Sequence, residues 1–254
     1  EPLSRAGYDV TNLERFGLMI RNSENAAYNY HKQMVSSGNA WSTSDGQQML
    51  WDAERTPVTM IAYAPYMSEA APDASLVVNA LTNQTTEENV KSSDFLLMKA
   101  TVDPEQDLTA DGKLKISLSH AMSKLLIKIT VNGTTDAAMN KLGDMSINGA
   151  VVNGICDLSA TVPIVVPAPD AVVATVAPYK GTESCECILP PQKIAEGFSV
   201  NFSYDGKLYI WTAKEAIELE KGVEHTLMLN VNTTVRLAAK MARNWATGQL
   251  IDRN

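Results

Sequence analysis

The stretch 113-KLKISLSHAMSKLLIKITV-131 is the longest strand-like run of the chain, and its alternation of apolar and polar residues shifts by one position after His120. Alternation of apolar and polar residues gives a strand one buried and one exposed face. A slip of one residue would turn the buried face outward unless a bend or bulge absorbs it. The sequence therefore predicts a bend over His120–Lys124, between two strand segments that both face a core. The alternating apolar residues are Leu114, Ile116 and Leu118 before the slip and Leu125, Ile127, Ile129 and Val131 after it, with Leu126 out of phase.

Other parts of the chain repeat this rhythm of short strands and turns. Apolar, strand-like runs occur near residues 15–21, 58–66, 95–100, 198–204, 207–211 and 227–231, and Asp-Gly pairs at residues 111–112 and 205–206 are hairpin signals. Residues 58–64 are apolar on both sides, which predicts a strand covered on both faces. The polar residues 22–39 are predicted to form a loop, in which a helical turn could occur. Many short strands without a sustained helical pattern predict an all-β protein built from β-sandwiches.

A turn signal and a polar segment interrupt the rhythm near the middle of the chain. Asn132-Gly133 is a second type of turn pair, and residues 134–139 are small or polar. Beyond them the pattern of strand and turn restarts. The predicted boundary is near residue 137, with domains at residues 1–137 and 138–254.

Composition places the chain among folded globular proteins and limits its partners. Of the 254 residues, 45% are hydrophobic and 20% are charged, and the net charge is −8. This charge would repel nucleic acid and anionic lipid, so neither is an expected partner. No run of about 18 apolar residues is present to span a bilayer. The chain begins at Glu1 without a signal-peptide pattern, so for an exported protein we expect the signal, and any lipidated cysteine, to have been removed.

Catalytic and metal-binding signatures are not found in the sequence. The GxSxG, HExxH, P-loop and GxGxxG motifs are absent. His31, His120 and His225 lie in separate segments without ligand spacing, and the acidic run 103–111 lacks the glycine and the closing glutamate of a calcium loop. A glycosidase would need a facing pair of carboxylates that no feature selects. We therefore expect no enzyme, no catalytic residue, no metal and no cofactor.

The chain has only three cysteines, Cys156, Cys185 and Cys187. Buried cysteine usually behaves as a small hydrophobic residue, so structural or free thiols are the first interpretation. In an oxidising compartment, Cys156 could instead form a disulfide with one of the other two. A metal site would need a fourth ligand that the spacing does not supply.

Four segments, in this order, resemble the fimbrillin family of surface pilus subunits and related lipoproteins of anaerobic Gram-negative gut and oral bacteria. They are VTMIAYAPYM (58–67), SHAMSKLLIKI (119–129), ILPPQ (188–192), and LEKGVEHTLMLNV (219–231) followed by ARNWATG (242–248). His225 stands where the family usually has tyrosine. The resemblance implies two tandem β-sandwich domains of transthyretin-like, Greek-key type.

The resemblance also implies a function. It predicts a non-enzymatic cell-surface fimbrial subunit or accessory adhesin, located in a fimbrium at the outer membrane. Such subunits assemble with other pilus subunits by strand exchange, in which a strand of one subunit fills a groove in its neighbour. Family members are often cut after an arginine, and Arg5 and Arg15 are the candidates here. The C-terminal segment 235–254, with Trp245 and Ile251, is the candidate donor strand, although it could equally be the last strand of its own domain.

A second interpretation keeps the fold and changes the function. A carbohydrate-binding outer-membrane lipoprotein would use exposed aromatic side chains to contact a host or bacterial surface glycan, and an adhesin could equally bind a surface protein. Trp41 and Trp211 are the candidate glycan contacts. The alternative for these aromatic residues is that they fill or border sandwich cores.

Overall fold

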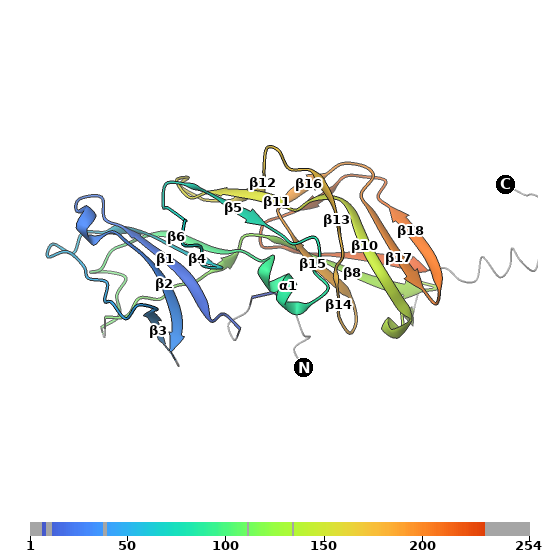
Figure 1. The fold of residues 1–254 in the computed structure, drawn as a ribbon, viewed down its shortest axis with the longest axis horizontal. Coiled ribbons are helices and arrows are strands. Elements are labelled where there is room, and N and C mark those ends of the chain that lie inside the picture. Colours follow the sequence, from blue (N-terminus) through green and yellow to red (C-terminus); the bar gives the residue numbers. More distant parts are fainter. Residues whose placement is uncertain (1–6, 9–11, 38–39, 111, 134, 232–254) are drawn as a thin grey trace, which may run out of the picture.

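The computed structural model describes residues 7–8, 12–37, 40–110, 112–133 and 135–231. The molecule is elongated and built almost entirely of strands, with a six-stranded sheet at one end (Figure 1). This confirms the predicted all-β class. The strands of this sheet, in spatial order, are β3 (Ala40–Thr43), β2 (Tyr30–Ser37), β1 (Arg15–Arg21), β4 (Val58–Ala64), β6 (Leu96–Val102) and β7 (Ser119–His120).

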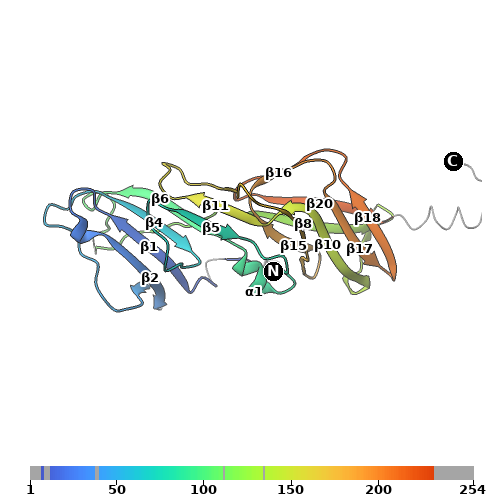
Figure 2. The same ribbon diagram turned by 45° about the horizontal axis from the view of Figure 1, so that its top comes forward.

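Two further sheets make up the other end of the molecule (Figure 2). One has the order β13 (Val173–Val176), β10 (Leu142–Val151), β17 (Ser199–Tyr204) and β18 (Lys207–Thr212). The other has the order β14 (Tyr179–Lys180), β15 (Cys185–Leu189), β8 (Ser123–Val131) and β20 (Glu224–Val231), and β9 (Thr135–Asp136) also pairs with β8. The inner faces of the two sheets share one hydrophobic cluster, as expected for a sandwich.

Smaller elements complete the described part of the chain. A three-stranded sheet has the order β12 (Val165–Pro167), β11 (Asn153–Asp157) and β5 (Ser75–Asn79), and β16 (Gln192–Ile194) pairs with β19 (Ile217–Leu219). The helices are α1 (Glu87–Ser92) and the short 3₁₀ turns η1 (Ala26–Tyr28) and η2 (Met139–Lys141). Pairing between these strands is antiparallel except between β8 and β20, which run parallel.

The predicted bend after His120 is confirmed. β7 ends at His120 and β8 begins at Ser123, with Ala121 and Met122 buried between them. β7 pairs with β6 in the six-stranded sheet, whereas β8 pairs with β15 and β20. The one-residue slip thus marks the point where the chain leaves one sheet for another. The residues before the slip pack on the smaller of two hydrophobic clusters, and those after it lie in the larger.

Two expectations about local structure were wrong. Residues 22–39 are not all loop, because β2 forms there. Its polar side chains gave no strand signal, but its backbone pairs along six residues with the apolar strand β1. Conversely, the alternating residues 113–118 do not form a strand in any described sheet; only Leu114 makes an isolated bridge, to Leu108.

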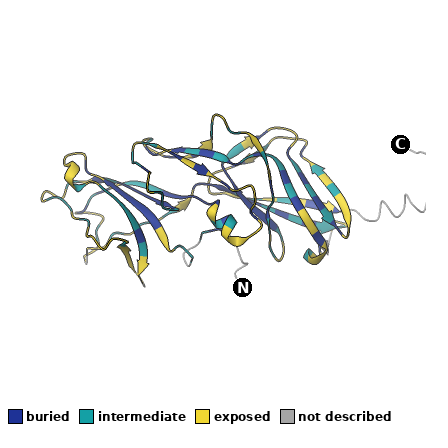
Figure 3. Ribbon diagram, viewed as in Figure 1, coloured by how far each residue is buried: buried dark blue, intermediate teal, exposed yellow. Residues whose placement is uncertain are grey.

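The predicted domain boundary near residue 137 stays a prediction. Strand pairing crosses it, because β8 lies before residue 137 and pairs with β15 and β20 after it. β5 also pairs with β11 across it. The larger cluster likewise combines residues such as Tyr63 and Phe95 with residues of the second half, and buried positions extend along the strands of both ends (Figure 3).

Candidate functional site: an apolar groove over the six-stranded sheet

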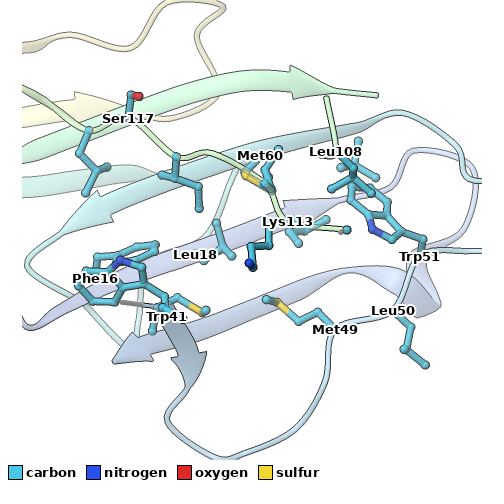
Figure 4. Close-up of a pocket in the computed structure, with 18 of the residues that line it drawn as sticks. Phe16, Leu18, Trp41, Met49, Leu50, Trp51, Met60, Leu108, Lys113 and Ser117 are labelled. Carbon is cyan, nitrogen blue, oxygen red and sulfur yellow. The ribbon is translucent and has the colours of Figure 1, made fainter. Parts of the chain in front are cut away.

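A groove with a volume of about 1060 Å³ lies over one face of the six-stranded sheet (Figure 4). Phe16 and Trp41 lie together at one end, Trp51 and Leu108 lie at the other, and Leu18 and Met60 lie between. Its floor consists of Phe16, Leu18, Ile20, Met34, Val58, Met60 and Leu96, and its walls include Trp41, Met49, Leu50, Trp51, Leu108, Leu114, Ile116 and Leu118.

The floor exists because the central strands are apolar on both faces. On β1, Phe16, Leu18 and Ile20 face the groove, while Met19 belongs to the larger cluster on the opposite face. β4 behaves in the same way, with six of its seven residues buried. This confirms that residues 58–64 form a strand covered on both faces. Strands buried on both faces read as continuous apolar runs instead of alternating ones.

One wall of the groove is an extended segment without strand partners. The backbone N–H and C=O groups of Ile116, Ser117 and Leu118 make no hydrogen bond within the part of the chain that the structure describes. Their alternating side chains nevertheless pack on the cluster that forms the floor. A β-sandwich would normally place a hydrogen-bonded sheet at this position. The wall is therefore strand-like in its side chains but unpaired in its backbone.

The neighbouring edge of the sheet is also open. β7 covers only Leu96 and Leu97 of β6, so the rest of β6 has β4 as its single strand partner among the described strands. Antiparallel pairing directs the backbone groups of alternate residues to the same side, and the hydrogen-bonded contact of Leu97 with Ser119 places Lys99 and Thr101 on the open side. An open strand edge beside an apolar groove is the geometry that accepts an additional strand.

Polar contacts close the groove at the bend. The Nδ1 atom of His120 lies 2.8 Å from Oδ2 of Asp94, whose side chain is 1% exposed. The same oxygen accepts a hydrogen bond from the backbone N–H of Tyr8 at 3.2 Å. The hydrogen bond to Asp94 raises the pKa of His120, against the opposing effects of burial and of Lys124. His120 thus ties the end of β7 to the connection between α1 and β6.

The described residues offer neither a metal site nor a reactive thiol. Within them, no group of three or more His, Cys, Asp or Glu side chains is placed to hold a metal ion. Cys156, Cys185 and Cys187 are buried free thiols, and burial raises the pKa of Cys156 to about 11 and that of Cys185 to about 12. The helices of the described part are all too short or too polar to cross a bilayer.

Of the site residues expected from the sequence, the structure places only Trp41 in the groove. Trp41 lies on β3 and contacts Phe16 edge-on, with ring centroids 4.9 Å apart, so it is part of the groove. Trp211 lies on β18 and packs edge-on against Phe198. β3 and β18 are at opposite ends of the molecule, so the two tryptophans do not form one platform (Figure 1).

Of the other expected site residues, only Arg15 lies within the described chain. Arg15 is the exposed first residue of β1 and pairs with Val35. Arg5, Trp245 and Ile251 lie outside the described residues. Sequence analysis missed the wall residues Met49 and Leu108, which lie in loops. The apolar run Met49-Leu50-Trp51 in a polar context was the signal that could have indicated them.

The family model for fimbrillin-like proteins matches residues 5–244 of the chain. The chain belongs to the fimbrillin-like family. Among curated proteins, none matches this fimbrillin-like chain.

Solved structures share the fold of this fimbrillin-like protein. A protein from Bacteroides uniformis described as a cell adhesion protein is 17% identical, with a TM-score of 0.70 over 90% of each chain. A second, from Bacteroides ovatus and described in the same way, is 17% identical, with a TM-score of 0.61 over 86% of this chain and 81% of its own. A fimbrial protein from Bacteroides ovatus is 15% identical, with a TM-score of 0.54 over 86% of this chain and 45% of its own. At these identities the likeness concerns the fold.

Proposed function

We propose that this fimbrillin-like protein is a non-enzymatic subunit of a cell-surface fimbria, or an accessory adhesin, that assembles with other pilus subunits by strand exchange. The observation that carries the proposal is the groove, in which an apolar floor lies beside an extended wall whose residues 116–118 have no backbone hydrogen bond to any described residue. Family membership and the fimbrial and cell adhesion descriptions of related folds support it. A location at the outer membrane is part of the same proposal.

The groove has the chemistry that a partner strand needs. A strand of five to six residues spans roughly 17–20 Å and presents every second side chain to the floor. Burying each large apolar side chain contributes about 1.5–3 kcal/mol. The partner's backbone would also pair with the open edge of β6 or with residues 116–118. A strand rich in apolar side chains would therefore be held both by burial and by backbone hydrogen bonds.

The donor and the processing site remain as the sequence suggested. Residues 235–254, with Trp245 and Ile251, are the proposed donor strand of a neighbouring subunit. A cut after Arg5 would leave β1 intact. A cut after Arg15 would separate the chain directly before Phe16, which is buried in the groove floor. Arg5 is therefore the favoured processing site in this proposal.

The test is assembly of the full chain after limited trypsin treatment, followed by electron microscopy, SDS gels and N-terminal sequencing. We expect filaments or SDS-resistant ladders with a new N-terminus at Ala6. Met49→Lys places a charge in the groove wall and should abolish assembly, whereas Met228→Lys on the exposed face of β20 should not. A processed chain that stays monomeric, or a Met49→Lys variant that assembles normally, contradicts the proposal.

One observation favours glycan binding as a second candidate function. Trp41 remains 40% exposed at the groove, where a sugar ring could stack on its indole face. Trp211 is less accessible because it packs on Phe198. Binding on a glycan array that is lost in Trp41→Ala and kept in Trp211→Ala would support this candidate.

A further inference from the structure

β18 is an unprotected edge strand. Among the described strands it is the last of its sheet and pairs only with β17, to which the two-residue turn Asp205-Gly206 connects it. Both turn residues have positive φ, 51° and 73°, as a type I′ hairpin turn requires. In such a turn the flanking residues, Tyr204 and Lys207, form a hydrogen-bonded pair.

This turn fixes which backbone groups face the open edge. Hydrogen-bonded pairs alternate along an antiparallel ladder, so Tyr209 and Trp211 bond to β17 as Lys207 does. The N–H and C=O groups of Leu208 and Ile210 therefore point to the open side. Neither residue has a hydrogen-bond partner within the described part of the chain.

The side chains of the same two residues are exposed apolar groups. Leu208 is 80% exposed and Ile210 is 73% exposed. Tyr209 and Trp211 point the other way, onto Phe202 and Phe198. Proteins usually protect edge strands with charges, prolines or bulges, yet β18 has none of these after its first residue, Lys207. Free backbone groups and exposed aliphatic side chains thus coincide on two residues.

We propose that two copies of this chain pair through β18, antiparallel and with two-fold symmetry, with Tyr209 opposite Tyr209 of the second copy. In this register Leu208 lies opposite Ile210 of the second copy, and the reverse, at positions where both residues direct their backbone groups to the new interface. Each pair exchanges two hydrogen bonds, and the aliphatic side chains meet across the strands. A shift of one residue would place outward-facing side chains opposite inward-facing ones.

Charge separates this register from one of the two registers that are shifted by two residues, the one centred on Ile210. With Tyr209 at the centre, Asp205 in the turn approaches Lys214, just beyond the end of β18 in the second copy. A shift that centres Ile210 would bring Asp205 toward Glu215 instead. Like charges facing each other across strands are unfavourable, so charge disfavours the register centred on Ile210.

The interface is separate from the groove. β18 lies at the end of the molecule opposite the six-stranded sheet (Figure 1). Pairing through β18 would therefore leave the groove open and would occur in the unprocessed chain. Its success or failure is independent of strand exchange.

Sedimentation analysis of the unprocessed chain over a concentration series tests the interface. We expect the mass to rise from 27.6 kDa toward twice that value. Ile210→Lys should hold the mass at that of one chain, whereas the matched control Met228→Lys should leave dimerisation unchanged. A mass of one chain at every concentration overturns the proposal, and so does a dimer that survives Ile210→Lys.

Oxidative cross-linking tests the register. Residues directly opposite at a non-hydrogen-bonded site have Cα atoms about 4.5 Å apart, which a disulfide can bridge. Tyr209→Cys should therefore give a covalent dimer, and the native cysteines, all buried, should contribute little background. Leu208→Cys should not cross-link, because its counterpart lies two residues along the partner strand. Cross-linking of Leu208→Cys but not of Tyr209→Cys, with both variants shown to be folded by circular dichroism, overturns the proposed pairing.

Discussion

Gln84 takes the place of a strand neighbour for β15. Its side chain is fully buried and makes two hydrogen bonds to the backbone of Ile188. Oε1 accepts from the Ile188 N–H at 2.8 Å, and Nε2 donates to the Ile188 carbonyl at 2.8 Å. Nε2 also donates to the carbonyl of Leu81 at 2.9 Å. One amide thus satisfies three backbone groups, of which the two of Ile188 are buried.

Replacement of Gln84 by leucine should remove all three hydrogen bonds while keeping the volume similar. Each buried backbone group left without a partner costs about 1–3 kcal/mol, so the two groups of Ile188 alone cost roughly 2–6 kcal/mol. Burial of the more apolar leucine side chain offsets about 1–2 kcal/mol of this. We expect Gln84→Leu to lower the free energy of unfolding by about 3 kcal/mol.

Gln192 provides a matched control within the same chain. It makes the same pattern of contacts: the Val151 N–H donates to its Oε1, and its Nε2 donates to the carbonyls of Val151 and Pro190, all within 3.0 Å. Gln192 and Val151 are only half-buried, so water can replace the lost bonds. Gln192→Leu should therefore cost about 1 kcal/mol.

Urea unfolding followed by tryptophan fluorescence would measure both variants. We expect the midpoint to fall further for Gln84→Leu than for Gln192→Leu, by an amount equivalent to about 2 kcal/mol, with unchanged m-values. Equal losses in the two variants would refute the reasoning, because they would show that burial does not set the cost of the unpaired groups.

Three further predictions concern single sites. Pairing with Asp94 raises the pKa of His120, so the protonated imidazole should stabilise the fold fully below about pH 6.5. This stabilisation should be lost as pH rises through the raised pKa. The difference in unfolding free energy between the native chain and His120→Gln should therefore shrink over the same pH range. Gly17→Ala places a Cβ 2.3 Å from Cζ of Tyr63, so urea unfolding should show a loss of about 1–3 kcal/mol or more, and less in a Tyr63→Ala background. Because burial raises the pKa of Cys187, no iodoacetamide labelling of Cys187 is expected until the chain unfolds.

The sequence predicts the fold where periodicity reports burial directly. The slip after His120 located the change of sheet, because each half of the run keeps its own apolar face. The apolar character of residues 58–64 predicted a strand covered on both faces. β2 was not predicted, because it is held in the sheet by backbone hydrogen bonds to β1. Backbone pairing does not require an alternating pattern of apolar and polar side chains.

The site was harder to predict than the fold, because the groove forms between segments far apart in sequence. Trp41 was singled out as a candidate ligand contact, yet its relation to Phe16 depends on the pairing of β2 with β3 and β1. Loop residues such as Met49 have no periodicity to indicate which surface they cover. Their role depends on the path of the chain between strands, which local sequence does not encode.

The alternating residues 113–118 connect the fold to the proposed function. Alternation of apolar and polar residues predicts a strand because a strand's side chains separate into two faces. The alternation does not show which chain supplies the backbone hydrogen bonds to that strand. Here Leu114, Ile116 and Leu118 pack on the groove floor, while the backbone of residues 116–118 is unpaired within the described chain. Unpaired strand backbone beside an apolar groove favours association with another strand. A clear strand signal that the described sheets leave unpaired is therefore the position at which the proposed partner strand would bind.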